Sequence, residues 1–229
     1  MVETTRIQSL YAEALRVENG RRIMASIAGL GGVAGFSDIE AASGVRGSTL
    51  VYHLNKMVAY GLLSNPVKGT YELTYKTPLC YIYGNGKEKV AYLGLLGRRE
   101  GRASPEPEVA SRLLLREGMT VDSMHVVTSP DALSDWSPHK LPYQWILCYE
   151  DEIIDIGMVV GKVEPVLREL LRERIVVMDC TSATKPASLA FYQLAERYLI
   201  PLVYVYEERG LLRWLISREE LAGRLGEGN

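Results

Sequence analysis

Cysteine and histidine are scarce in this 229-residue sequence, with three of each. Cys80, Cys148 and Cys180 lie far apart in apolar runs, so zinc-ligand spacing is missing, and their odd number excludes a complete disulfide framework. We expect buried, reduced thiols. Apolar runs are far shorter than the roughly 20 residues of a membrane span, and the N-terminus has no signal-peptide core. The composition predicts a cytoplasmic protein with no metal, cofactor or membrane partner.

Net charge is also small, because 26 basic residues face 28 acidic ones. This balance excludes a protein whose whole surface coats polyanions. The charge is uneven along the chain, with a slight basic excess up to Pro78 and an acidic excess after it. Together with the patterns described below, this asymmetry favours two domains, residues 1–78 and residues 79–229. A nucleic-acid module joined to a second domain would have such a distribution.

Helical spacing of apolar residues predicts two helices before residue 30, and glycines within residues 31–35 end the second. Ser37 followed by Glu40 indicates a capping box at the start of a short helix over residues 38–43. After Gly44, a helix is predicted over residues 48–60, with Leu50, Leu54 and Met57 facing a core. Alternation in residues 70–75, after a turn at residues 65–69, indicates a β-hairpin.

The other face of the helix over residues 48–60 is polar and cationic. Hydroxyl, aromatic and basic groups suit phosphates and base edges. The candidate DNA-binding residues on this helix, at the residue before it and on the hairpin turn are Arg46, Ser48, Thr49, Tyr52, His53, Lys56 and Lys68.

A short helix, a tight turn, a polar-faced helix and a β-wing, in this order, make a winged helix-turn-helix. The string GVRGSTLVYHLNKMVAYGLL, which ends at Leu63, resembles ArsR/MarR-like repressors, in which a recognition helix leads into the wing. The resemblance covers roughly residues 20 to 77 and implies binding to double-stranded DNA. The alternative is a small helical domain that only dimerises or packs on its neighbour.

From residue 88 onward, short apolar segments alternate with amphipathic helices. This pattern predicts an α/β fold with a Rossmann-like, mainly parallel sheet flanked by helices. Strands are expected at 90–96, 123–128, 144–149, 175–179, 202–206 and 211–216, and helices at 106–117, 163–174 and 186–198. Residues 153–160 fit either a strand or the start of a helix. Ligands of parallel sheets bind beyond the carboxyl ends of the strands, which selects residues 97–104, 128–132 and 180–185.

The segment Asp179 to Pro186, DCTSATKP, joins a strand to a helix. Its three hydroxyls, its lysine and the N–H groups of a helix start suit an anion such as phosphate. The glycines of a Walker A loop are missing, and the first strand of the sheet has no GxGxxG motif. Ordinary helix caps and turns are the alternative explanation.

The string VVMDCTSATKPASLAFYQLA resembles the D-x-T-G-G-T-K-x-x-S motif of CARF domains, the CRISPR-associated Rossmann-like ligand sensors. The resemblance implies a homodimer that binds a cyclic oligoadenylate or a similar nucleotide. It also implies nine ligand-binding positions: Gly97, Arg98, Thr128, Ser129, Asp179, Thr181, Ser182, Thr184 and Lys185. Ser182 and Ala183 replace the paired glycines of the motif, which allow close approach of the backbone to phosphate.

These patterns leave three functions open. The first is a CRISPR-associated transcription regulator that binds DNA through the winged helix and responds to cyclic oligoadenylate. The second is a ring nuclease that cleaves the cyclic oligoadenylate without metal, with Lys185 or an arginine stabilising charge on the phosphate. The third is a non-enzymatic dimerisation or adaptor protein. Residues 179–185 contain no His, no Glu and no carboxylate besides Asp179, which disfavours acid–base catalysis, and no catalytic residue is predicted.

Overall fold

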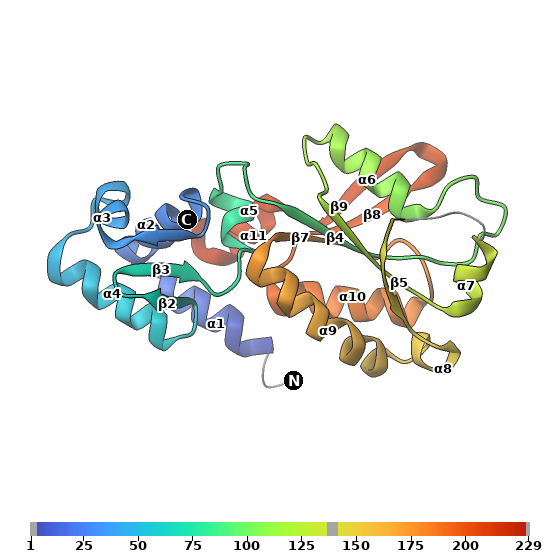
Figure 1. The fold of residues 1–229 in the computed structure, drawn as a ribbon, viewed down its shortest axis with the longest axis horizontal. Helices are drawn as coiled ribbons and strands as arrows, with labels where there is room; N and C mark the ends of the chain where they lie inside the picture. Colours follow the sequence, from blue (N-terminus) through green and yellow to red (C-terminus); the bar gives the residue numbers. More distant parts are fainter. Residues whose placement is uncertain (1–3, 137–141, 228–229) are drawn as a thin grey trace.

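The computed structural model describes residues 4–136 and 142–227. The chain folds around two sheets, one of three strands and one of six, with the order β6-β5-β4-β7-β8-β9 in the larger. Figure 1 shows the smaller sheet and its helices at one end of the long axis and the larger sheet at the other. The fold is mixed α/β, and the mainly parallel sheet flanked by helices confirms the predicted fold class.

The N-terminal part consists of four helices and three short antiparallel strands. Strand β3 lies between β1 and β2. In chain order the elements are α1 (Thr4–Leu15), α2 (Glu18–Gly29), β1 (Val33–Gly35), α3 (Phe36–Ser43), α4 (Gly47–Ala59), β2 (Leu63–Val67) and β3 (Thr70–Leu73). The helix expected over residues 48–60 and the hairpin after it are both present.

Helix α3 starts earlier than its sequence suggests. Gly35 is its N-cap residue and no side chain caps it, so the predicted capping box of Ser37 and Glu40 is wrong. Glu40 instead accepts a hydrogen bond from the backbone N–H of Gly47 at the start of α4, at 3.3 Å. The carboxylate therefore links α3 to α4 across the turn between them.

The C-terminal part follows the predicted alternation. The strands are β4 (Val90–Leu95), β5 (Ser123–Thr128), β6 (Gln144–Leu147), β7 (Ile175–Asp179), β8 (Leu202–Tyr206) and β9 (Leu211–Ile216). The first five run parallel, and β9 pairs with β8 in the antiparallel direction. Every residue of β4 and β7 is buried, as expected of central strands covered on both faces.

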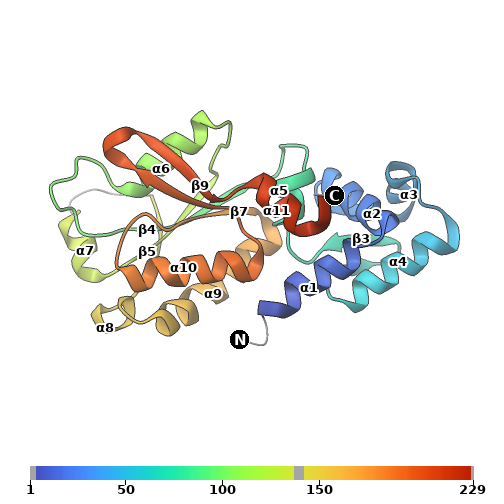
Figure 2. The same ribbon diagram turned by 180° about the vertical axis from the view of Figure 1, so that it is seen from behind.

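Helices cover both faces of this sheet (Figures 1 and 2). Helix α6 (Glu106–Arg116) lies on one face, and α9 (Ile156–Glu173) and α10 (Lys185–Tyr198) lie on the other. For residues 153–160 the sequence fitted either a strand or the start of a helix. Residues 156–160 belong to α9, so the helix is correct. The short helices are α5 (Leu79–Tyr83), α7 (Pro130–Asp135), α8 (Glu150–Ile153) and α11 (Arg218–Ala222), with single turns at Glu207–Arg209 and Gly223–Glu227.

Helices α9 and α10 are among the elements of the C-terminal part that contact the N-terminal part, together with α5 and the turn at Gly223–Glu227. The side-chain amide of Gln8 in α1 donates to the carbonyl of Glu196 in α10 at 2.7 Å. The N–H of Lys76 donates to the carbonyl of Leu171 in α9 at 2.6 Å. One hydrophobic core runs through both parts. Because α10 begins at the carboxyl edge of the large sheet, this helix connects that edge with α1 (Figure 2).

No helix in residues 4–136 and 142–227 has the length and hydrophobicity needed to cross a membrane. All three cysteines are free and buried, as their apolar surroundings predict.

Candidate functional site

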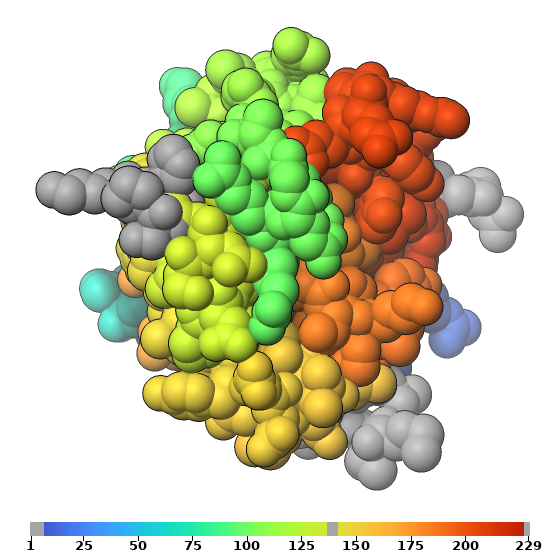
Figure 3. All heavy atoms as spheres, turned by 90° about the vertical axis from the view of Figure 1, so that its right-hand side faces the viewer, coloured from blue at the N-terminus to red at the C-terminus, as the bar shows by residue number. Residues whose placement is uncertain are grey.

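The three loops selected from the sequence meet at the carboxyl edge of the parallel sheet. Figure 3 looks onto this edge. The loop over residues 97–104, in green, lies between α7 in yellow-green and the orange and red segments that follow β7 and β8. Strand order places β4 between β5 and β7, which brings the three loops together although they are far apart in sequence.

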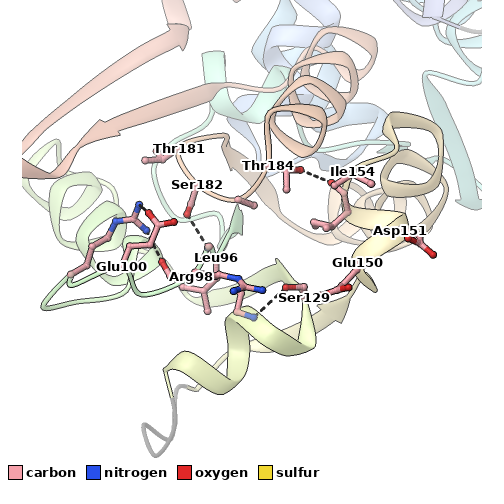
Figure 4. A pocket seen from close by; sticks show the side chains of 15 residues that line it. Leu96, Arg98, Glu100, Ser129, Glu150, Asp151, Ile154, Thr181, Ser182 and Thr184 are labelled. Carbon is pink, nitrogen blue, oxygen red and sulfur yellow. Dashed lines mark hydrogen bonds and ion pairs between the residues drawn. The ribbon is translucent and has the colours of Figure 1, made fainter.

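A pocket of about 530 Å³ opens between these loops (Figure 4). Its lining combines apolar, hydroxyl and charged side chains. The lining residues are Leu96, Gly97, Arg98, Glu100, Arg102, Ser129, Ala132, Glu150, Asp151, Ile153, Ile154, Thr181, Ser182, Ala183 and Thr184. A partly apolar pocket with a few converging polar groups is the usual form of a small-molecule site.

The floor of this pocket is tied together by side chains from three strand ends. The hydroxyl of Thr128 donates to the carbonyl of Leu96 at 2.9 Å. The N–H of Gly97 donates to the Ser182 hydroxyl at 2.8 Å, and the Trp136 indole donates to the Gly97 carbonyl at 2.9 Å. A Cβ on Gly97 would lie 2.7 Å from the Ser182 oxygen. Glycine is therefore required at residue 97 by the close approach of the two loops.

The hydroxyl protons of residues 181, 182 and 184 are committed within the protein. Thr181 donates to Asp179 and accepts from the N–H of Val205 at 2.8 Å. Ser182 donates to Glu106 at 2.7 Å, and Thr184 donates to the carbonyl of Ile153. The expectation that all three hydroxyls face an anion therefore differs from the structure. Each long-range partner comes from another segment, and these bonds fix the loop.

The backbone of the same loop offers the donors that its hydroxyls do not. No described residue accepts a hydrogen bond from the N–H groups of residues 182, 183, 184 and 185. Ala183 has φ of 66°, in the left-handed region that favours glycine, at one of the positions where the resemblance implies paired glycines. Consecutive unpaired N–H groups at a helix start make an anion-binding concavity.

Lys185 is the first residue of α10 and is exposed. It does not line the pocket, and it makes no hydrogen bond or ion pair within the described ranges. A lysine at the positive end of a helix dipole is unfavourable, so an anion beside these N–H groups would relieve that repulsion.

Two arginines reach the pocket, and carboxylates neutralise both. Arg98 pairs with Asp131 of α7 at 3.1 Å. Arg102 pairs with Glu106 and with Glu100, the latter at 3.5 Å. An anionic ligand must therefore compete with these carboxylates for the guanidinium groups.

Asp179 lies beneath the pocket and not in its wall. The carboxyl is 1% exposed and accepts hydrogen bonds from the N–H of Thr181 at 2.8 Å and from the hydroxyl of Tyr92 at 2.7 Å. Burial raises the pKa of Asp179 to about 6, against the lowering effect of the hydrogen bonds from Thr181 and Tyr92. Its geometry makes it a support for the loop.

The structure thus brings most of the predicted ligand residues into one place. Six of them line the pocket: Gly97, Arg98, Ser129, Thr181, Ser182 and Thr184. Thr128 and Asp179 lie below it, buried. The hydroxyl oxygen of Ser129 caps α7 by accepting from the N–H of Ala132 at 3.2 Å, and its proton remains available to a ligand.

Sequence reasoning missed the acidic side of the pocket. Glu150, Asp151, Ile153 and Ile154 come from α8 and the residue after it. A helix of four residues has no periodicity that a sequence could reveal. The charged pair Arg102 and Glu106 was missed as well, since a carboxylate at the start of a helix is normally solvated.

The predicted DNA-binding residues lie just before α4, along α4 and on the hairpin turn. Arg46, Ser48, Thr49 and Lys68 are exposed, and Tyr52 is 62% exposed. His53 is half-buried, and burial lowers its pKa. Lys56 is half-buried too, because it pairs with Glu13 of α1 at 3.2 Å and lies over the Tyr60 ring. Lys56 is therefore the least accessible cation of the set.

Within residues 4–136 and 142–227, no cluster of three or more His, Cys, Asp or Glu side chains could hold a metal ion. The hydrogen-bond donors of the pocket are N–H groups, hydroxyls and guanidinium groups, which suit a phosphate, and its carboxylates Glu100, Glu150 and Asp151 suit groups that donate hydrogen bonds.

Three solved structures share part of the fold. Can2 from Sulfobacillus thermosulfidooxidans in complex with cyclic tetra-adenylate has a TM-score of 0.40 and 12% identity, and the match covers 56% of this chain and 35% of that one. Protein VC1899 from Vibrio cholerae has a TM-score of 0.42 and 14% identity, with 61% of this chain and 34% of that one covered. Csm6 from Enterococcus italicus bound to cyclic hexa-2'-fluoro-hexa-dAMP has a TM-score of 0.37 and 11% identity, with 62% of this chain and 39% of that one covered. The matched region thus spans under two fifths of each of these chains. We draw no functional conclusion from likenesses at this level.

No protein-family model matches the chain, and no curated protein matches its sequence.

Proposed function

We propose that the chain is a CRISPR-associated transcription regulator, which binds a cyclic oligoadenylate or related nucleotide in the carboxyl-edge pocket and double-stranded DNA through its N-terminal part. One observation carries the nucleotide proposal. Four consecutive backbone N–H groups without an acceptor among the described residues lie at the start of α10, beside a pocket of about 530 Å³. The motif resemblance of residues 176–195 to CARF domains supports the choice of ligand.

The N–H groups of residues 182–185, the Ser129 hydroxyl and Lys185 supply donors for one phosphate, and the apolar side chains Leu96, Ile153 and Ile154 supply contact area for a nucleoside. A phosphate at this point gains from the helix dipole and from charge-assisted hydrogen bonds. We further propose that two chains form a homodimer, so that a cyclic ligand contacts both copies of this loop.

The DNA proposal rests on the outward face of α4. A helix with exposed hydroxyl and aromatic side chains, preceded by the exposed Arg46 and followed by a hairpin with an exposed lysine, fits the major groove and the neighbouring backbone. Helix α10 runs from the pocket to α1, and α1 is joined to α4 through Glu13 and Lys56. This contiguous path gives a ligand a physical means to shift the N-terminal part.

The decisive experiment is titration of the protein with cyclic tetra-adenylate in a calorimeter, followed by chromatography of the nucleotide. Recovery of an intact bound ring supports a sensor. Linear products would identify a ring nuclease instead. Absence of heat and of retained nucleotide would contradict the nucleotide proposal and leave a dimerisation or adaptor role.

Lys185→Ala is expected to weaken binding of cyclic tetra-adenylate by about tenfold, in the range of one hydrogen bond to a charged group. The melting temperature without ligand should stay within about 1 °C of wild type, because Lys185 is exposed and its side chain makes no hydrogen bond or ion pair with a described residue. Lys87→Ala, which removes an exposed lysine outside the pocket lining, is the control. Equal affinity of the Lys185 variant and the control would refute the role of Lys185.

Lys68→Glu is expected to weaken binding to DNA of any sequence and to reduce the slope of log affinity against log salt by about one, the value for one lost phosphate contact. Lys68 is preferable to Lys56 because it is exposed and Lys56 is paired with Glu13. Lys87→Glu, with the same charge change outside the N-terminal part, should leave the slope unchanged. Equal slopes for both variants would contradict the assignment of the hairpin to DNA.

Light scattering at micromolar concentration tests the homodimer. A mass near 25.5 kDa, that of one chain, would contradict it.

A further inference from the structure

A second pocket, of about 710 Å³, lies on the other side of the loop over residues 97–104. Glu100, Arg102 and Thr181 line both pockets, so the two are continuous around this loop. The remaining wall comes from the end of β8 and the turn after it. The residues of this wall are Tyr204, Val205, Tyr206, Glu207, Glu208 and Arg209, and Gly101 of the loop and Glu106 of α6 complete the lining. In Figure 3 this wall is the red segment facing the green loop.

Glu106 is the buried polar group of this second pocket, with 3% of its surface exposed. Its Oε1 accepts hydrogen bonds from Ser182 at 2.7 Å and from Arg102. Its Oε2 is also buried and has no hydrogen-bond partner in the described part of the chain. A buried acceptor without a donor is costly and rare in folded proteins. Arg102 and Glu106 both line this pocket, and Arg102 bonds only Oε1, so Oε2 is left to accept a donor that a ligand brings into the pocket.

The rest of the wall suits a planar and uncharged group. Tyr204 and Tyr206 lie with ring centroids 4.9 Å apart at 61°, and Tyr206 is 47% exposed. Aromatic rings of this kind bind nucleobases by stacking. Four glutamates and two arginines line the pocket, so it disfavours phosphate and favours an N–H donor. These properties are complementary to those of the first pocket, which offers backbone N–H groups.

We propose that the second pocket is a nucleobase subsite selective for a base that carries an exocyclic amino group. The amino group donates to Oε2 of Glu106, the ring stacks on Tyr206, and the phosphate of the same nucleotide lies at the start of α10. This inference rests on the proposed function. It adds that Glu106 determines base specificity, because adenine donates at this position and hypoxanthine, with a carbonyl in place of the amino group, does not.

Glu106→Gln tests this inference. The amide oxygen of the new side chain can still accept from Ser182 and Arg102, whereas its amide nitrogen replaces the unpaired acceptor by a donor. Affinities are measured by calorimetry for cyclic tetra-adenylate and for its cyclic tetra-inosinate counterpart. Wild type should prefer the adenine ring by about 10-fold to 100-fold, the range of a hydrogen bond to a charged group. The variant should bind the inosine ring more tightly than the adenine ring.

The control is Glu208→Gln, a matched change at an exposed carboxylate of the same pocket, which should keep the wild-type preference. Tyr206→Ala should weaken both rings by a similar factor of about tenfold. Equal binding of both rings by wild type, or an unchanged preference in a folded Glu106→Gln protein, would overturn the base subsite and leave the proposed function intact. Binding of neither ring by wild type would overturn both. Melting curves confirm that each variant is folded.

Discussion

Ser182→Ala is expected to lower the free energy of unfolding by about 2–4 kcal/mol, a large effect for one hydroxyl. The hydroxyl accepts from the N–H of Gly97 and donates to Glu106. Both partners are buried, and alanine would leave a backbone donor and a carboxylate oxygen with one partner fewer. An unsatisfied buried polar group costs about 1–3 kcal/mol, and more when it is charged. Urea unfolding measures the change, with an unchanged m-value as the sign of an intact transition.

Ser134→Ala is the matched control for this experiment. Its hydroxyl is exposed and donates only to the carbonyl of Asp131 within its own helix, so the expected loss is below about 0.5 kcal/mol. A similarly small loss for Ser182→Ala would show that the two loops are not held together by this hydroxyl. The role of Ser182 at a glycine position of the motif would then need another explanation.

The elements of the fold were predictable because their apolar residues repeat with the period of their secondary structure. Leu50, Leu54 and Met57 mark the buried face of α4, and the continuous apolar run of β4 marks a central strand. Periodicity reports which side of an element is buried. It does not report what the other side contacts, and, apart from the start of α3, the differences between prediction and structure are of this second kind.

The loop at residues 180–185 illustrates the limit. Its position beyond a parallel strand and its fit to an anion followed from sequence alone, and the structure places it beside a pocket. The sequence could not show that Thr181 binds the backbone of Val205 or that Thr184 binds that of Ile153. Strand order determines which distant segments these hydroxyls meet. Because the hydroxyls are bonded within the protein, the donors left for an anion are the backbone N–H groups of residues 182–185.

Glu106 shows the same limit for charge. In the sequence it stands at the start of an amphipathic helix, where a carboxylate is favourable next to the dipole and normally solvated. Its burial depends on Ser182, which lies far along the chain and reaches it only because β4 and β7 are neighbours. Likewise, helical spacing placed Lys56 on the polar face of its helix but could not show that Glu13 of α1 pairs with it.

Asp179→Asn is expected to change how stability depends on pH. Burial raises the pKa of Asp179 to about 6 from its ordinary value near 3.8. Between these two values the folded state therefore binds more protons than the unfolded state, and stability falls as pH rises through this window. A difference of about two pKa units corresponds to about 3 kcal/mol. Relative to wild type, the asparagine variant should thus gain about 2–3 kcal/mol between pH 4 and pH 7.

Urea unfolding of both proteins at several pH values gives this difference directly, because contributions from other carboxyl groups cancel between them. Tyr92→Phe is the informative companion, since it removes a hydroxyl that donates to the carboxylate and should raise the pKa of Asp179 further. Stability of the phenylalanine variant should therefore fall more steeply with pH than that of wild type. If the stability of Asp179→Asn relative to wild type instead fell from pH 4 to pH 7, the prediction would be wrong. The fold would then stabilise the ionised carboxylate, as a salt bridge to a cation such as Lys185 would do.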